Sequence, residues 1–361
     1  MGRAAITALA ELQVGRRIVN PAESVSRTEI VKKKRSGEGA KLVILTVTLN
    51  AAIDKTFSID HFSIDRVHRP TSWEIVPGGK GINVARVYRT LGGEAVATGF
   101  IGGHNGEAIQ DGLRSEGIPF DFTHTAGESR VCIAVVDHAE NTQTEINENG
   151  PLVTDEEIER MKLKFESLVQ GMEFAVLSGS APPGTPANTY ADLIEIARKY
   201  GVRCMLDTSG EHLAGGIAAT PYIIKPNSFE LSAVLGRQIS TVEEAAQAAS
   251  EYNAKGIEVV IVTLGRDGAI VASQGVVWWA KSPEIRFVSA VGSGDSLAAA
   301  FLFSFLNGSD LVDCLKMGTA AGAANAMTFG AGFCKREDIL SLMDKVEVQE
   351  LAEVMPRDMT T

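Results

Sequence analysis

The chain has 361 residues, 45% of them hydrophobic, which is enough for a sizeable core in one or two α/β domains. Its formal net charge of −11 argues against a nucleic acid or an anionic membrane surface as the main partner. The longest apolar runs are too short to cross a bilayer, and four widely spaced cysteines predict neither a zinc site nor a disulfide framework, so we expect a cytoplasmic protein.

The first 40 residues differ in composition from the rest of the chain. They hold eight Lys or Arg against four Asp or Glu, with a basic run at residues 32–35. We interpret residues 1–40 as a poorly ordered N-terminal extension. A targeting peptide is the alternative, although the glutamates in this stretch disfavour it. Residues 41–350 are expected to form the folded domain, and residues 351–361 a C-terminal tail.

From residue 41 onward, strand-like and helix-like segments alternate. The apolar run 42–49 predicts a buried strand. Further strands are expected at 95–100, 174–178, 202–207, 222–225, 259–263, 269–272 and 285–288. Helices are expected at 82–91, 155–170, 189–200 and 241–254. This order predicts a mostly parallel central sheet with helices on both faces, and such sheets bind ligands beyond the carboxyl ends of their strands.

Two segments interrupt this alternation. Residues 56–76 and 121–148 contain short runs in which apolar and polar residues alternate, a pattern typical of antiparallel strands. We expect a small accessory sheet that acts as a lid and excludes water from a transfer reaction. The alternative is a static edge of the main sheet.

A glycine cluster at residues 77–83 leads into the first predicted helix. Gly79 permits close approach of the backbone to a small ligand. Lys80 can supply charge to a phosphate, and the amide of Asn83 can bind a sugar hydroxyl. A tight strand-to-helix turn with a solvated lysine would give the same pattern.

A second polar segment follows the predicted strand 222–225. Asn227 and Glu230 lie three residues apart, which places them on one face of a helical turn. Such a pair can hold water molecules around a Mg²⁺ ion. Capping of a helix by Asn227 explains the pattern equally well.

A third segment, residues 291–296, follows the predicted strand 285–288 and opens an apolar helix that runs to about residue 306. Gly292 and Gly294 let backbone N–H groups point at a ligand, and the start of a helix favours an anion such as a phosphoryl group. Asp295 is a candidate base or a capping carboxylate. The chain lacks a P-loop motif and the third glycine of the dinucleotide fingerprint, which disfavours a P-loop enzyme and a dehydrogenase.

Each of these segments follows a predicted strand, so all of them belong at one edge of the sheet. Together they resemble the two signatures of the PfkB family of carbohydrate kinases, over about residues 42–350. The resemblance implies a ribokinase-like α/β fold with a small antiparallel β lid, and ATP and Mg²⁺ as cofactors. It makes Asp295 the catalytic base and gives the anion hole to Gly292, Ser293 and Gly294.

The resemblance also assigns binding roles to other positions. Asp54, with Gly79, Lys80 and Asn83, would bind the sugar, and Asn227 and Glu230 would organise magnesium through water. The segment 263–268 resembles the part of the family that lies along ATP, and 320–325 the helix beside adenine. The implied ATP-binding residues are Lys225, Asn227, Thr263, Gly265, Gly268 and Asn325.

Within the family, residues 127–134 (Gly-Glu-Ser-Arg-Val-Cys-Ile-Ala) resemble the branch of 1-phosphofructokinases and tagatose-6-phosphate kinases. This implies that Arg130, and also Arg69, contact a substrate phosphate, for which a guanidinium group is well suited. We therefore expect phosphorylation of tagatose 6-phosphate or fructose 1-phosphate to the bisphosphate. Two alternative functions remain open: a kinase of an unphosphorylated sugar or nucleoside, and a non-catalytic sugar-phosphate sensor. The protein could also form a homodimer.

Overall fold

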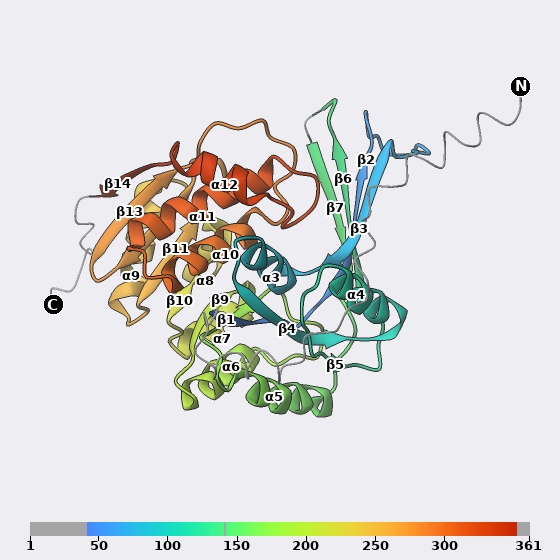
Figure 1. The fold of residues 1–361 in the computed structure, drawn as a ribbon, viewed down its shortest axis with the longest axis horizontal. Helices are drawn as coiled ribbons and strands as arrows, with labels where there is room; N and C mark the ends of the chain where they lie inside the picture. Colours follow the sequence, from blue (N-terminus) through green and yellow to red (C-terminus); the bar gives the residue numbers. More distant parts are fainter. Residues whose placement is uncertain (1–41, 141, 352–361) are drawn as a thin grey trace, which may run out of the picture.

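The structure is a computed structural model that describes residues 42–140 and 142–351 (Figure 1). The expected N-terminal extension, residues 1–40, falls outside the described residues, as does the expected tail, 351–361, except for Leu351, which ends a strand. Two sheets form the described part: a main sheet of ten strands, covered by helices on both faces, and a small sheet of four strands that projects from it (Figure 1). No helix in these described ranges is long and apolar enough to cross a membrane.

The main sheet has the strand order β14-β13-β12-β11-β10-β9-β8-β1-β4-β5. Neighbours from β11 to β5 run parallel, and β11 to β14 pair antiparallel at the other edge. The mostly parallel sheet is thus confirmed. Its strands are β1 (Val43–Thr48), β4 (Glu94–Ile101), β5 (Thr123–His124), β8 (Phe174–Ser178), β9 (Arg203–Asp207), β10 (Ile223–Ile224), β11 (Val259–Thr263), β12 (Ala269–Ser273), β13 (Val276–Lys281) and β14 (Glu347–Leu351).

The prediction of a strand at 285–288 is wrong. This stretch is irregular, and the backbone N–H groups of Val288 and Ser289 both donate to the carbonyl of Ala326, at 2.8 and 3.2 Å. Because these donors bind the end of a helix, they do not pair with a strand. The segment therefore lies along the end of α11 and delivers the chain from there to the glycine turn at Gly292.

Ten α-helices and one short 3₁₀ helix connect the described strands. The helices at 82–91, 155–170, 189–200 and 241–254 are confirmed to within two residues at each end. The α-helices are α3 (Lys80–Thr90), α4 (Gly103–Ser115), α5 (Asp155–Val169), α6 (Thr189–Lys199), α7 (Gly210–Ala218), α8 (Ser228–Leu235), α9 (Val242–Ala254), α10 (Ser293–Leu306), α11 (Leu311–Ala326) and α12 (Arg336–Met343), and the 3₁₀ helix is η2 (Gly265–Asp267).

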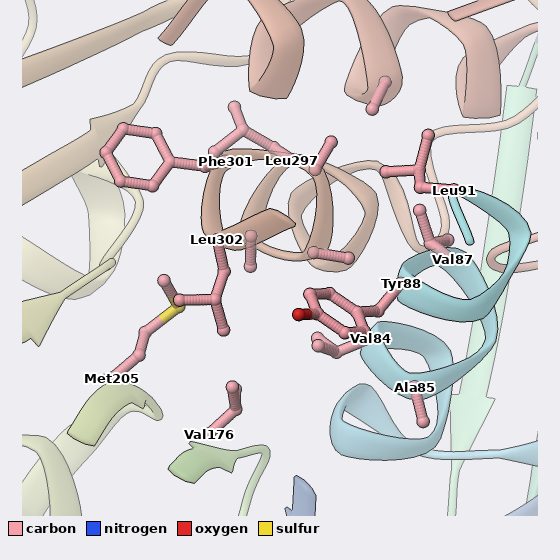
Figure 2. Packing of buried hydrophobic residues seen from close by; sticks show 14 of the residues in the cluster. Val84, Ala85, Val87, Tyr88, Leu91, Val176, Met205, Leu297, Phe301 and Leu302 are labelled. Carbon is pink, nitrogen blue, oxygen red and sulfur yellow. The ribbon is translucent and has the colours of Figure 1, made fainter. Parts of the chain in front are cut away.

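The main sheet separates two hydrophobic cores. Successive side chains of a strand point to opposite faces, so in β1 Ile44 joins the core under α3, α10 and α11, while Leu45 joins the core under α5 and α6. Figure 2 shows the first core, where Tyr88 of α3 and Leu302 of α10 lie above the strand residue Val176. This packing holds α3 and α10 side by side, so both helices begin at the carboxyl edge of the sheet.

The small sheet has the order β3-β2-β6-β7 and is formed by β2 (Ala52–Ser58), β3 (Ser72–Gly78), β6 (Arg130–Asp137) and β7 (Thr142–Asn147). Its two outer pairs are antiparallel, and its central pair, β2 with β6, is parallel. The predicted accessory sheet is therefore present. The start of the segment 121–148 instead forms β5 and completes the edge of the main sheet.

Candidate active site

A cavity of about 490 Å³ lies between the small sheet and the carboxyl ends of the main-sheet strands. Most of the residues predicted from the sequence line it, although they come from segments far apart in the chain. From the body of the molecule these are Gly79, Lys80, Asn83, Lys225, Asn227, Glu230, Thr263, Gly292, Gly294 and Asp295, and from the small sheet Asp54 and Arg130. The topology of the parallel sheet explains this gathering, because all of its strands end at one edge.

Asp295 lies in the first turn of α10 and faces this cavity. Its side chain caps no backbone N–H, and its Oδ2 instead accepts a hydrogen bond of 2.8 Å from Nδ2 of Asn83 on α3. Burial raises the pKa of Asp295 to about 6, although the Lys80 ammonium and the Asn83 bond act in the opposite direction. The capping alternative is therefore not observed, and a carboxylate with this pKa suits a general base near neutral pH.

The glycine turn before α10 forms an anion-binding start to the helix. Gly292 has φ 79°, in the left-handed region, and a Cβ there would lie 2.7 Å from the Cβ of Ala331. Only glycine fits this turn without strain. The N–H groups of the first helical turn have no partners within the helix, and the Nζ of Lys225 lies 3.4 Å from the position of a Cβ on Gly294. Together these groups favour a phosphoryl anion.

The sequence analysis missed Asp207, at the end of β9. Its carboxylate is fully buried between two ammonium groups, 2.9 Å from Nζ of Lys80 and 3.0 Å from Nζ of Lys225. Burial alone would raise the pKa of Asp207, but Lys225 and Lys80 outweigh it and lower that pKa. A polar residue at the carboxyl end of a predicted strand is the signal that could have identified Asp207.

The surroundings of the Lys80 side chain differ from those expected from the sequence. Its ammonium group binds Asp207 and lies 3.5 Å from Oε1 of Glu230, so it is not a solvated turn lysine. Burial alone would lower its pKa, but the carboxylates of Asp207, Glu230 and Asp295 raise it above the ordinary value. Lys80 therefore stays charged and offers a positive group on the wall shared with Lys225.

The small sheet contributes a carboxylate and a guanidinium. A Cβ on Gly78 would lie 2.1 Å from the carboxyl carbon of Asp54, so the glycine makes room for that carboxylate. Burial raises the pKa of Asp54 to about 6, partly offset by Arg130 and Arg86. Arg130 donates from Nε to the carbonyl of Asn50, at 3.1 Å, and its guanidinium is thereby oriented along the cavity wall.

Three residues of β7 were also missed. Gln143, Glu145 and Asn147 alternate along one face of this strand, and Glu145 and Asn147 line the cavity. Glu145 accepts from Nε2 of Gln143 at 2.7 Å and from Nδ2 of Asn147 at 3.1 Å. Asn147 lies opposite Cys132, which also lines the cavity. The alternating pattern predicted a strand here, but only its register beside β6 shows which face meets the cavity.

Asn227 and Glu230 form a capping box at the start of α8. Oδ1 of Asn227 accepts from the N–H of Glu230 at 2.7 Å, and Oε2 of Glu230 accepts from the N–H of Asn227 at 2.9 Å. The capping alternative is therefore observed. The other oxygen, Oε1 of Glu230, faces Lys80 in the cavity, and the described residues offer no cluster of three or more acidic, His or Cys ligands. This donor set fits a Mg²⁺ ion held through water and phosphates.

Five other predicted positions do not line the cavity. Arg69 is exposed in the connection between β2 and β3, and Gly268 turns the chain against the carbonyl of Ala280. Ser293 and Gly265 also lie outside the cavity lining.

Asn325 is the fifth position, and its side chain does not reach the cavity. It is fully buried: its Nδ2 donates to the carbonyl of Val291 at 2.7 Å, and its Oδ1 accepts from the N–H of Gly332 at the same distance. Since both polar groups of the amide are used, the side chain braces the glycine turn at the start of α10.

Known proteins resemble this chain over most of its length. A profile described as pfkB family carbohydrate kinase matches residues 47–338. The 1-phosphofructokinase of Bacillus subtilis is 33% identical over 309 residues, covering 86% of this chain and 100% of that protein. The tagatose-6-phosphate kinase of Staphylococcus epidermidis is 34% identical over 312 residues, with coverage of 86% and 100%. Phosphofructokinase-2 from Escherichia coli, solved in complex with substrates and products, matches with a TM-score of 0.78, 29% identity and coverage of 84% and 99%.

Proposed function

The chain belongs to the pfkB family of carbohydrate kinases, and on that premise we propose that it transfers the γ-phosphoryl group of ATP to a hydroxyl of a hexose phosphate. The product is the corresponding bisphosphate. The observation that carries the proposal is the carboxylate of Asp295, buried beside the start of α10 with its pKa raised to about 6. It places a base next to an anion-binding helix start, as an in-line transfer requires.

In the proposed mechanism, Asp295 takes the proton of the sugar hydroxyl as that oxygen attacks the γ-phosphorus, and the bond from this phosphorus to the bridging oxygen of ADP breaks so that ADP leaves. The side-chain amide of Asn83 holds the carboxylate in place by donating from Nδ2 to Oδ2 of Asp295 at 2.8 Å. The first-turn N–H groups of α10 and the Lys225 ammonium stabilise the negative charge of the transferring group. Positioning and charge stabilisation supply most of the catalysis in such a transfer.

The small sheet supplies recognition of the sugar phosphate. Arg130 suits the phosphate because a guanidinium can form two parallel hydrogen bonds with it. Asp54 suits a sugar hydroxyl, and Glu145 and Asn147 add polar groups on the same wall. Since the relatives are a 1-phosphofructokinase and a tagatose-6-phosphate kinase, fructose 1-phosphate and tagatose 6-phosphate are the proposed substrates.

We call the side of the cavity formed by the main sheet and its helices the body wall. Its residues suit contacts with ATP and with Mg²⁺. Thr263 and Lys225 line the side of the cavity proposed for ATP. Glu230 and Asn227 would hold a Mg²⁺ ion through water, and the ion would neutralise phosphate charge. Beside them, Asp207 keeps the ammonium groups of Lys80 and Lys225 pointing at the same space. This arrangement supplies local positive charge in a protein whose net charge is −11.

We also propose that the small sheet acts as a lid. Its strand β7 touches the body through a hydrogen bond of 3.0 Å, donated by the Ser289 hydroxyl to Oε1 of Gln143. On β3, Glu74 packs against the body at Gly330, where a Cβ would lie 2.2 Å from its Oε2. The inner end of β3 is held more firmly, since the carbonyl of Pro77 accepts a hydrogen bond of 2.7 Å from Arg86. A sheet anchored at this end suits an element that closes over the substrate.

The outer face of the small sheet supports self-association. Trp73, Ile75 and Ile146 are exposed there, with 63%, 53% and 59% of their surface accessible. An apolar face of this kind suits a second copy of the chain. Sedimentation of the native protein and of an Ile75→Glu variant tests this. We expect a dimer that the substitution weakens, and a monomeric native protein would exclude it.

The proposed function is tested by ADP release over a panel of acceptors. The panel holds fructose 1-phosphate, tagatose 6-phosphate, fructose 6-phosphate and the unphosphorylated sugars. We expect turnover of at least one of the first two and little or none of the unphosphorylated sugars. Preference for an unphosphorylated sugar would assign a different substrate class, and no ADP release with any acceptor would overturn the proposal.

A further inference from the structure

Arg86 is a buried arginine on α3, one turn after Asn83 and only 6% exposed. All five of its N–H donors are used. Nε and Nη2 donate to the two carboxylate oxygens of Glu116, at 2.7 and 3.1 Å, and Nη2 also donates to the carbonyl of Pro77 at 2.7 Å. Nη1 donates to Oδ1 of Asn83 and to the carbonyl of Ala331, both at 2.9 Å.

These bonds connect Arg86 to both glycine turns of the candidate site. Pro77 directly precedes Gly78 and Gly79, and Ala331 packs against Gly292 at the start of α10. The ring of Phe333 lies 4.6 Å from the guanidinium carbon and covers its face. Arg86 therefore sits behind the site, touching its framework without lining the cavity.

The contact with Asn83 fixes which way that amide points. A side-chain amide has a donor end and an acceptor end of nearly the same shape, so it can rotate by half a turn unless its partners differ. The guanidinium of Arg86 has donors but no acceptor. Of the two ends of the Asn83 amide, only the oxygen Oδ1 can therefore face it. Nδ2 is then forced toward Asp295, whose ionised carboxylate can only accept, at 2.8 Å.

We propose that Arg86 is a positioning residue for catalysis, which acts through the amide of Asn83 to hold Asp295 ionised and aimed at the substrate hydroxyl. This inference rests on the proposed kinase function and deepens it. The buried carboxylate of Glu116 holds the guanidinium in plane, so the chain of contacts runs from Glu116 through Arg86 and Asn83 to the base.

The charges around Asp295 set the direction of the expected effect. Lys80 and Lys225 favour its ionised form, and Asp207 and Asp54 oppose it. The hydrogen bond from Asn83 also favours the ionised form, as Lys80 and Lys225 do. If the amide loses its orientation, the ionised form loses that bond, and the pKa of Asp295 rises above about 6. The acid limb of kcat/KM should then move to higher pH.

The test compares Arg86→Met with Arg89→Met, a matched change one turn along the same helix. Arg89 pairs with Glu94 at 3.0 Å and does not line the candidate site. We expect Arg86→Met to lower kcat by about 10- to 100-fold, with KM for the sugar phosphate within about threefold, and to move the acid limb up by about one pH unit. Arg89→Met should leave kcat and the pH profile unchanged.

A double-mutant cycle separates positioning from general loss of structure or charge. Arg86 also lowers the pKa of Asp54 directly by its charge, and that effect does not need Asn83. In an Asn83→Ala background there is no amide to orient, so adding Arg86→Met should change kcat by less than about threefold. A loss as large as in the native background would overturn the proposal.

Misfolding of the Arg86 variant and failure of the proposed function can each be told apart from failure of this inference. If Arg86→Met does not fold, Arg86→Gln takes its place in the same cycle, because a glutamine can present either a donor or an acceptor to Asn83, and unchanged kcat and pH profile in Arg86→Gln would overturn the proposal. Failure of the proposed function is seen separately, because the native protein would then release no ADP with any acceptor. An active native protein with an additive cycle would remove only the role of Arg86.

Discussion

The two walls of the cavity are built in different ways. On the body wall, Asp207 and Lys225 are 0% and 3% exposed, and each charged group is bound by partners from other elements of the fold. On the small-sheet wall, Glu145 and Asn147 are exposed, and their hydrogen bonds stay within one strand. Buried and fully bonded networks are rigid, whereas exposed groups on a thin sheet can move.

The difference separates chemistry from recognition. Asp295 is fixed by contacts from α3 and lies beside Lys80, so a change on the body wall should disturb the transfer step itself. Arg130 and the β7 side chains can change without altering that network. On the proposed function, we expect such an arrangement to let one framework serve different sugars, with the small sheet setting the choice. The four predictions below would break or sharpen this separation.

The largest effect is expected for Asp295→Asn, which keeps the shape of the side chain but removes the base. We expect kcat to fall by roughly 10²- to 10⁴-fold while the affinity for ATP is retained, as measured by ADP release and by nucleotide titration. The exposed Asp111→Asn on α4 is the control and should leave kcat unchanged. An unaltered kcat in Asp295→Asn would show that the body wall does not hold the base.

Arg130→Ala should act on recognition only. We expect KM for a phosphosugar to rise by about 10- to 100-fold, the scale of a charge-assisted hydrogen bond, with kcat little changed. KM for an unphosphorylated sugar should rise much less. The exposed Arg114→Ala on α4 controls for the loss of one positive charge. An equal loss on both substrates would make Arg130 a structural residue of the small sheet.

The pH dependence reports on carboxylates from both walls. Burial raises the pKa values of Asp295 and Asp54 to about 6. A base must be ionised to accept a proton, so activity is present above this pH and is lost as the pH falls through it. We expect kcat/KM, measured from about pH 5 to 8, to fall by about tenfold per unit below pH 6, and more steeply if both groups must ionise. A flat profile down to pH 5 would contradict this.

The smallest effect is expected in the mobility of the small sheet. Adding the preferred phosphosugar should slow amide hydrogen exchange in residues 56–76 and 130–147, because closure protects these strands. ATP alone should do less, since its proposed contacts lie on the body wall. Hydrogen-exchange mass spectrometry of the free, sugar-bound and nucleotide-bound forms measures this. Equal exchange in all three forms would mean that the small sheet is a static edge.

The sequence predicted the fold well, because buried strands and helices carry a clear hydrophobic pattern. It also identified the glycine turns before α3 and α10. A left-handed backbone conformation, such as that of Gly292, favours glycine, and glycine can be recognised in the sequence. The sequence of residues 285–288 resembles a strand, but the stretch is irregular. The backbone N–H of Val288 donates to the carbonyl of Ala326 at the end of α11 and not to a neighbouring strand. Local pattern cannot reveal a partner that lies far along the chain.

The same limit explains what the sequence does not show within the site. It does not show that Asp207 lies beside Lys80, 127 residues away along the chain. It also does not show that the amide of Asn325 braces the turn at Val291. The face of β7 that meets the cavity depends on its register beside β6. These are pairings between distant elements, and only the assembled sheet shows them.

Cys132 gives the small-sheet wall of the cavity a thiol that can be labelled. It lines the cavity and is partly exposed, whereas Cys204, Cys314 and Cys334, the other thiols of the chain, are buried. Burial raises the pKa of Cys132 to about 11, so its thiol reacts slowly at neutral pH and a reagent can be matched to that rate. A fluorine or fluorescent label attached there would sit on the small sheet and report on its distance from the body without any added cysteine.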